Sequence, residues 1–245
     1  MNSRTEASNL VCEFLGVFAL TLIGPGAIIA TGGQNLVAIA LAHGLALGLM
    51  IAAAGHISGG VFNPAVAIGL MATGKLPAAR GVTYIVAQVF GGIVAALCLL
   101  APFPASARDA VRLGTSLPGP GVSAGQALLA EIILTFFLMF VVFGVAVDKR
   151  GPATIAGLAI GLTVTFDILM GGGISGAAMN PARWFGPALV SGSWDAAWVY
   201  LVGPTVGALI AAFLYNTLLL PQPEPQAASS HANEAPVDLP QGATD

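Results

Sequence analysis

Two stretches of nine residues decide the fold: ISGGVFNPA at residues 57–65 and ISGAAMNPA at residues 174–182. They align without a gap at an offset of 117 residues. Chance does not account for several anchors at a nearly constant spacing, so the chain consists of two copies of one unit. Within one residue, the same offset recurs at two further pairs, Glu13 with Glu131 and Tyr84 with Tyr200.

The composition around these stretches is that of a membrane protein. Charged residues make up 8% of the 245 positions and hydrophobic residues 56%, too few charges to cover a water-soluble domain. A helix that crosses a bilayer needs about 20 mainly apolar residues. The sequence predicts such spans at about 10–29, 37–54, 83–101, 127–147, 153–171 and 196–219.

Two apolar stretches, 64–72 and 181–191, are too short to cross, and each is opened by Asn-Pro-Ala. They are predicted to be re-entrant half-helices that end inside the membrane. Each unit contains three spans, an odd number, so the second copy is inverted. We therefore expect an all-α membrane protein of six transmembrane helices and two re-entrant half-helices in an inverted repeat, with repeat one at about 10–101 and repeat two at about 127–219.

Basic residues in short loops indicate the orientation. With the N-terminus in the cytoplasm, most of them lie inside and only Arg108 and Arg112 lie outside, apart from Arg183 in the second re-entrant loop. Both termini are therefore predicted to be cytoplasmic, with an N-terminal segment at 1–9 and a disordered, Pro-rich acidic tail at 220–245. The inside set is Arg4, Lys75, Arg80, Lys149 and Arg150.

The repeated Asn-Pro-Ala box has a local structural role and a second, functional one. Asn before Pro is a favourable helix start, because Pro lacks the N–H that would be unpaired there and Asn can accept from a later one. With each Asn oxygen used in this way, we expect both amide NH₂ groups to remain free to donate into a lumen. Two helix N-termini that meet at mid-membrane also repel protons and cations. The boxes are Asn63, Pro64, Ala65 and Asn180, Pro181, Ala182.

These paired boxes, the run GHISGG at 55–60 and Arg183 directly after the second box resemble the aquaporins, or major intrinsic proteins. The resemblance covers about residues 8–219 and implies an aquaporin channel domain at 10–219. It implies a passive channel for water, and for small neutral solutes, that excludes protons and ions. It further implies a homotetramer with one pore in each protomer, placed here in the cell membrane, plasma or inner, as a multi-pass protein.

The resemblance also carries over a selectivity filter by spacing from the boxes: His43, Ile168, Ala177 and Arg183. The set is similar to that of some plant vacuolar-membrane intrinsic proteins. The narrow water-only pattern has a His in the fifth span where this chain has Ile168, so urea, ammonia or hydrogen peroxide are expected to accompany water. A glycerol facilitator is the alternative, but those usually carry Asp after the Arg, where this chain has Trp184. A secondary transporter with broken helices and a non-conducting junctional protein are more distant alternatives.

Two acidic residues inside apolar spans, Glu13 and Glu131, resemble the family's loop supports, which accept hydrogen bonds from loop backbone; proton transfer is the minority interpretation. Asp167 beside Ile168 is expected to cap a helix or pair with a loop, with an influence on solute choice as the alternative. Trp184, Trp194 and Trp198 are expected to anchor the membrane interface. Pore-facing carbonyls are expected at Gly59, Gly60, Val61, Gly176, Ala177 and Ala178.

Other chemistry finds no support in the sequence. No Cys or His cluster has the spacing of a metal site, and no phosphate-binding Gly-rich motif or nucleophile with a base occurs. We expect no metal, no cofactor, no enzymatic activity and no nucleic-acid partner. The expected partners are water, small neutral solutes, the lipid bilayer and further copies of the chain.

Overall fold

The protein, represented by a computed structural model, is described here over residues 3–221, with side chains from residue 5 onward. Within that range it is an all-helical bundle in which six helices are long and apolar enough to cross a membrane, as the sequence predicts. The helices are α1 (Ser3–Thr31), α2 (Leu36–Ser58), α3 (Pro64–Ala72), α4 (Ala78–Cys98), α5 (Ala105–Ala110), α6 (Ala124–Val142), α7 (Ala156–Gly171), α8 (Pro181–Ser191) and α9 (Ala197–Leu214), with short helical turns η1 (Arg112–Gly114), η2 (Phe143–Val147), η3 (Ala153–Ile155) and η4 (Tyr215–Leu219).

The short helices α3 and α8 have the bounds that the sequence predicts for the half-helices, whereas several spans differ at their ends. Helix α1 begins at Ser3 rather than near residue 10, so most of the expected N-terminal segment is helical. Helix α4 begins directly after Pro77, five residues before the expected start. From residue 222 on, the expected tail lies outside the described residues.

Local sequence explains how several helices begin and end. Asn35 caps α2 by accepting a hydrogen bond from the N–H of Ala38, and Gly59 ends the helix in a left-handed conformation with φ of 96°. Helix α6 begins with a capping box in which Ser123 and Gln126 bond reciprocally. These short polar signatures fix the boundaries that hydropathy alone leaves open.

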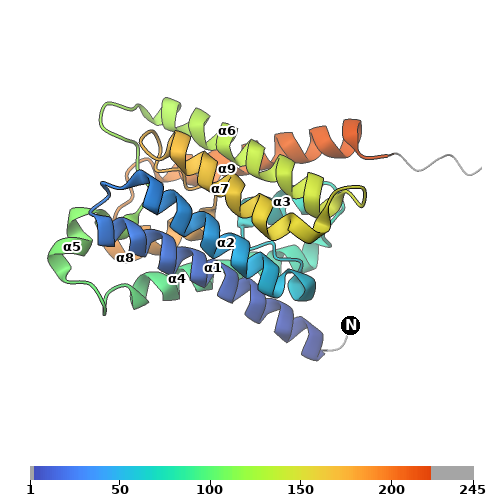
Figure 1. Ribbon diagram of the computed structural model, residues 1–245, viewed down its shortest axis with the longest axis horizontal. Helices are drawn as coiled ribbons and strands as arrows, with labels where there is room; N and C mark the ends of the chain where they lie inside the picture. The colour runs from blue at the N-terminus through green and yellow to red at the C-terminus, as the bar shows by residue number, and fades with distance from the viewer. Residues whose placement is uncertain (1–2, 222–245) are drawn as a thin grey trace, which may run out of the picture.

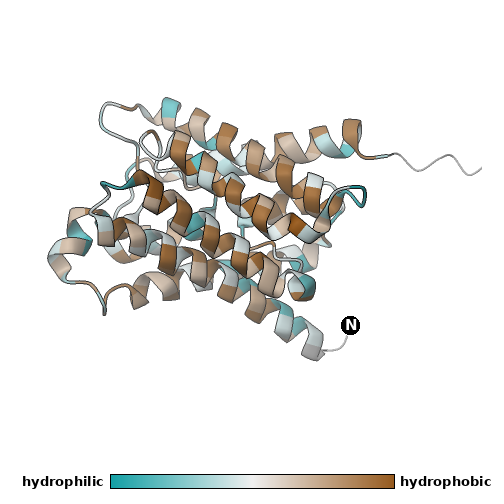
Figure 2. Ribbon diagram, viewed as in Figure 1, coloured by the Kyte–Doolittle hydropathy of each residue, from teal (hydrophilic) through white to brown (hydrophobic). Residues whose placement is uncertain are grey.

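The arrangement of the helices follows the inverted repeat. The half-helices α3 and α8 lie toward opposite ends of the bundle, and both ends of the described chain lie at the end opposite α5, on different sides of it (Figure 1). Hydrophobic residues cover the long helices, while hydrophilic ones gather at the two ends of the bundle (Figure 2). Exposed Val82, Val86 and Phe90 follow one another at four-residue spacing along α4, which suits a lipid-facing stripe.

Glycines let the long helices pack at close range. An added Cβ at Gly91 would lie 2.3 Å from the carbonyl oxygen of Phe14, where α4 crosses α1. The second repeat has an equivalent contact: an added Cβ at Gly207 would lie 2.2 Å from the carbonyl oxygen of Ile132. No larger residue fits at either crossing, so the close packing is built into both copies of the unit.

The two repeats meet along α2 and α7, again through glycine. An added Cβ at Gly44 would lie 2.4 Å from the carbonyl oxygen of Gly161, and one at Gly161 would lie 2.4 Å from that of Gly44. This reciprocity is what a pseudo-twofold axis between the repeats requires. The bundle is therefore closed around an interior shared by both half-helices.

Candidate functional site

The half-helices begin at their Asn-Pro boxes as expected. The Oδ1 atom of Asn63 accepts from the N–H of Ala65 at 2.9 Å, and that of Asn180 accepts from Ala182 at 3.0 Å and from Arg183 at 3.2 Å. Pro occupies the first helical position in both helices. Each Asn has an extended backbone directly before the first helical residue, so it stands at the tip of its half-helix.

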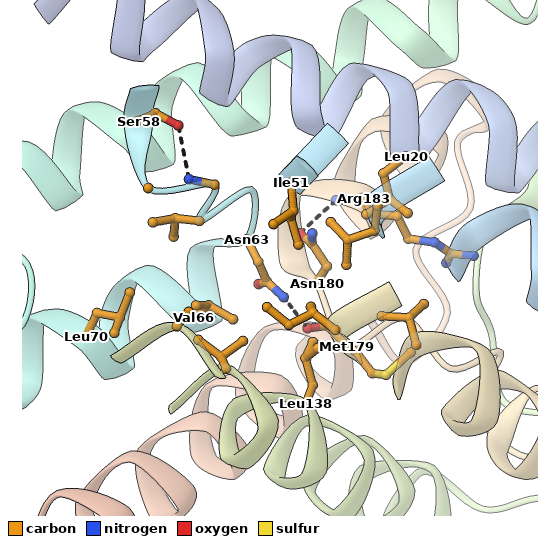
Figure 3. Close-up of a pocket in the computed structure, with 18 of the residues that line it drawn as sticks. Leu20, Ile51, Ser58, Asn63, Val66, Leu70, Leu138, Met179, Asn180 and Arg183 are labelled. Carbon is orange, nitrogen blue, oxygen red and sulfur yellow. Dashed lines mark hydrogen bonds between the residues drawn. The ribbon is translucent and has the colours of Figure 1, made fainter. Parts of the chain in front are cut away.

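The amide groups of the two asparagines correct one expectation. Asn63 donates from Nδ2 to the carbonyl oxygen of Met179 at 2.9 Å, and Asn180 donates to that of Phe62 at 2.8 Å. Each amide has two N–H groups, so one is used to join the tips and one is left. The two Asn side chains lie next to each other at the centre of the site (Figure 3). The expectation that both amides are entirely free is wrong, because the residue before each box presents its carbonyl to the opposite tip.

Two buried carboxylates hold the loops that lead to the boxes. Glu13 accepts from the N–H groups of Val61 and Phe62 and from the Ser58 hydroxyl, at 2.7 to 3.1 Å, and from Gln88 Nε2 at 2.7 Å. In the second repeat, Glu131 accepts at 2.7 to 2.8 Å from the N–H groups of Ala178 and Met179 and from the Ser175 hydroxyl. The backbone donors are thereby turned away from the lumen, as the loop-support interpretation requires.

The loops follow the same unusual backbone path in both repeats. Gly59 and Gly60 have φ of 96° and 64°, and their counterparts Gly176 and Ala177 have 78° and 44°. Most of the expected pore carbonyls belong to residues that line the central cavity: Gly59, Gly60, Val61, Ala177 and Ala178. Gly176 differs, since its carbonyl accepts from the Ser116 hydroxyl at 2.9 Å and it is not among the lining residues.

A cavity of about 420 Å³ runs along the tips of the half-helices. Its lining includes both box asparagines and mostly aliphatic side chains between them and the ends, such as Leu70, Val66 and Leu138 (Figure 3). Lys75 and Arg80 line it as well. All four positions expected to form the filter also line this cavity, namely His43, Ile168, Ala177 and Arg183.

The Arg183 guanidinium is buried and held by side chains from two other parts of the chain. Its Nη2 lies 2.7 Å from Nε2 of His43, and its Nη1 donates to the Ser116 hydroxyl. His43 Nδ1 lies 2.8 Å from the carbonyl oxygen of Ile39, which can only accept. Nδ1 therefore carries the proton, and Nε2 is the acceptor for Arg183.

Ser116 is a site residue that the sequence reasoning missed. It lies in the segment between η1 and α6, has no counterpart in the repeat and belongs to no motif. Its carbonyl oxygen accepts from Nε1 of Trp184 at 3.2 Å. Trp184 is 1% exposed and stacks on Tyr200 at 5.3 Å, so the expectation that it anchors the membrane interface is wrong. Its position in the first turn of α8 places it inside the bundle.

Asp167 does not behave as expected either. Its side chain is 1% exposed, and within the described residues neither carboxyl oxygen has a hydrogen-bond partner. The expected capping or loop pairing is therefore not seen. Asp167 is also not among the residues that line the cavity, although Ile168 beside it is. Over residues 3–221, no three His, Cys, Asp or Glu side chains gather in a way that could hold a metal ion.

Comparisons with known sequences and structures point to one family. The profile of the Major intrinsic protein family matches residues 1–215. Aquaporin TIP4-4 of Zea mays is 42% identical over 229 residues, covering 89% of this chain and 88% of that protein. Aquaporin AqpM of Methanothermobacter marburgensis is 40% identical over 235 residues, covering 85% and 96%. The solved structure of the aquaglyceroporin from Plasmodium falciparum has a TM-score of 0.80 at 27% identity, covering 87% and 96% of the two chains.

The chain therefore belongs to the major intrinsic protein family, the aquaporins. It is a multi-pass membrane protein with the fold class that the sequence predicts. As a member of this family it is a passive transmembrane channel for water and small solutes, and not an enzyme.

Proposed function

We propose that this channel passes water together with urea, ammonia and hydrogen peroxide, and that His43, Ile168, Ala177 and Arg183 select among them. The observation that carries the proposal is that these four residues and both box asparagines line a single cavity. Arg183 and His43 supply polar groups on one side, while Ile168 and Ala177 supply apolar surface. A filter with one polar side admits small neutral molecules that can accept a hydrogen bond from the guanidinium.

Proton exclusion is proposed to arise at the tips of the half-helices. One N–H of Asn63 and one of Asn180 remain after the bonds that join the tips. A water molecule between them would accept with its oxygen and turn its hydrogens toward its neighbours in the file. The chain of donors and acceptors that proton hopping needs is thereby interrupted, and the positive ends of both half-helices oppose cations.

Glycerol is the second candidate, because the solved relative from Plasmodium falciparum is an aquaglyceroporin. The described lining contains no Phe, Tyr or Trp ring that could receive the carbon backbone of a polyol. We therefore place glycerol below urea in permeability. A secondary transporter would differ by saturating and by coupling flux to an ion.

The assembly and location are proposals as well. We propose a homotetramer in the cell membrane, plasma or inner, with both termini in the cytoplasm. The basic residues of the short loops support the orientation, and membership of the family supports the tetramer. Crosslinking in native membranes tests the tetramer, and fractionation of those membranes tests the location, with an intracellular membrane as the contrary result.

Permeability of purified protein in liposomes to water, urea, ammonia, hydrogen peroxide and glycerol tests the proposal. Ile168→His restores a polar wall and is expected to lower the ratio of urea to water permeability. The matched control is Ile160→His, which places the same ring two turns away in the same helix and cavity lining. An unchanged ratio in Ile168→His, or an equal change in both variants, contradicts the proposed filter.

A further inference from the structure

Both terminal nitrogen atoms of the Arg183 guanidinium are hydrogen-bonded. His43 on α2 accepts from Nη2, and Ser116, which lies between η1 and α6, accepts from Nη1. A guanidinium has five N–H groups, and these contacts use two of them. Nε of Arg183 is buried and has no partner within the described residues. The hydrogen bonds to His43 and Ser116 therefore determine how the other N–H groups of the guanidinium are oriented.

Ser116 is itself fixed in place. Its hydroxyl donates to the carbonyl oxygen of Gly176 at 2.9 Å, so toward Arg183 it can only accept. Its own carbonyl accepts from Trp184 at 3.2 Å, and a Cβ added to Gly176 would lie 2.7 Å from the Cβ of Ser116. Three residues of the second re-entrant segment thus contact Ser116 from different directions. Since Ser116 is 3% exposed and does not line the cavity, it can influence a solute only through Arg183.

We propose that Ser116 is a positioning residue that determines the specificity of the channel. It fixes the guanidinium of Arg183 so that the donors not used by His43 and Ser116 face the passing solute. The inference rests on the proposed filter, because it assigns Ser116 a role only through Arg183. It adds a position outside both repeats and both Asn-Pro-Ala boxes.

The expected consequence of removing the hydroxyl follows from the burial of Nη1. A charged donor that loses its only buried acceptor is strongly disfavoured, and the cavity that Arg183 lines is where the donor can reach water instead. The guanidinium therefore turns toward the passage and narrows it. Because urea needs a wider passage than water, Ser116→Ala is expected to lower the ratio of urea to water permeability by about tenfold, the size of effect expected for one hydrogen bond to a charged group.

The neighbouring residue provides the matched control. The Thr115 hydroxyl donates to the carbonyl oxygen of Arg112 and lies 3.2 Å from the Ser191 hydroxyl, with no contact to Arg183. Thr115→Ala therefore removes a hydroxyl from the same segment without touching the guanidinium, and it is expected to leave the ratio unchanged. Ser116→Thr keeps the hydroxyl and is expected to retain most of the native ratio of urea to water permeability.

A double-mutant cycle separates positioning from a purely structural role. The ratio of urea to water permeability is measured by stopped flow in proteoliposomes for Ser116→Ala, Arg183→Val and the double variant. We expect Ser116→Ala to change the ratio in the native background and to have no further effect beside Arg183→Val. An unchanged ratio in Ser116→Ala, or the same loss in both backgrounds, would overturn the inference while leaving the filter intact. If Arg183→Val alone has no effect, the proposed filter fails, and the inference falls with it.

Discussion

The two repeats hold their re-entrant loops in the same way but present different side chains to the lumen. In each, a buried glutamate accepts from two loop N–H groups and from a serine hydroxyl. A tyrosine hydroxyl then donates to the carbonyl of that serine, Tyr84 to Ser58 at 2.9 Å and Tyr200 to Ser175 at 2.8 Å. These shared parts are structural.

The repeats diverge where the solute is selected. At the offset of 117 residues, Arg183 in the second repeat corresponds to Val66 in the first, and both line the cavity. The Arg183 guanidinium and its contacts with Ser116 and His43 therefore have no counterpart at Val66 in the first repeat. The parts that the two copies share therefore build the scaffold, and the proposed filter lies at positions where the copies differ.

The largest effect is expected from removing either glutamate. Glu13→Ala and Glu131→Ala each leave two loop N–H groups unpaired, at about 1–3 kcal/mol each, so we expect a loss of about 3–5 kcal/mol in the free energy of unfolding. Glu13 has one partner more, Gln88, whose position corresponds to Pro204 in the second repeat. Thermal unfolding in detergent should therefore show the larger loss for Glu13→Ala.

Gln88→Leu sharpens this test. In that background Glu13 keeps the same three donors as Glu131, two backbone N–H groups and one serine hydroxyl, so the two Glu→Ala losses are expected to become equal. If Glu13→Ala and Glu131→Ala differ in the Gln88→Leu background as much as in the native protein, the supports are not equivalent and the symmetry is superficial.

The next effect concerns the asparagines at the tips. Asn63→Asp replaces the donor that reaches the Met179 carbonyl with an acceptor, and Asn180→Asp does the same opposite Phe62. We expect each to cost about 1–2 kcal/mol of stability, because an acceptor then faces an acceptor. Each also places a negative charge at the point where both half-helices repel cations.

A cation leak measured with a potential-sensitive dye in proteoliposomes is therefore expected for both variants, with water flow retained. Asn63→Ser is the control, since Ser can still cap the helix but carries no charge. A leak in the Ser variant as large as in the Asp variant would show that the loss of the amide donor, and not the added charge, opens the path.

The sequence predicted the parts of the site that are repeated or locally encoded. The half-helix bounds were correct because Asn and Pro fix a helix start within two residues. The ends of α1 and α4 were not, since hydropathy reports where lipid lies and a helix can continue into the polar layer, as it does from Ser3. Hydropathy locates the spans and leaves their ends undetermined.

The contacts between segments far apart in the sequence could not be predicted. The bonds from Asn63 to Met179 and from Arg183 to Ser116 join residues 116 and 67 positions apart, and they depend on how the repeats pack. Nor does the sequence reveal that Asp167 is buried without a partner, because neighbours on other helices decide that. The two Asn-Pro-Ala motifs predicted where the cavity lies. The packing of the helices determines which N–H groups of its lining residues remain without a protein acceptor.

A smaller effect is expected where the repeats differ in backbone strain. Gly60 and Ala177 correspond, and both have positive φ, which an L-residue tolerates at a cost of about 1–2 kcal/mol. Gly60→Ala is expected to lower the free energy of unfolding by about 1 kcal/mol, because the strain outweighs the smaller freedom of alanine in the unfolded chain. Ala177→Gly is expected to raise it by less, because a Cβ at Gly60 would in addition lie 3.2 Å from the Cα of Gly55. Thermal unfolding of both variants measures this. Equal and opposite shifts would mean that the close approach to Gly55 adds no cost at Gly60.

The smallest effect concerns a group of hydrogen bonds around Asp148 in the second repeat. The Asp148 carboxylate accepts from Nε of Arg150 at 2.9 Å and from the Tyr215 hydroxyl at 3.3 Å, and Arg150 donates to the carbonyl of Leu219 at 2.7 Å. The segment after α6 is thereby joined to η4, which follows α9. The corresponding residue of the first repeat, Thr31, bonds from its hydroxyl to carbonyls of its own helix.

Hydrogen bonds from the Arg150 side chain hold the pKa of Asp148 below its ordinary range. A carboxyl whose pKa is lowered by folding stabilises the protein fully above its unfolded pKa of about 3.9, and that contribution disappears as the pH falls through the folded value. The difference in thermal midpoint between the native protein and Asp148→Asn is therefore expected to narrow below about pH 4. Asp195→Asn, which breaks the exposed pair with Arg112, is the control and should change the midpoint little at neutral pH. A difference that stays constant down to about pH 3 would mean that the link depends on the shape of the side chain and not on its charge.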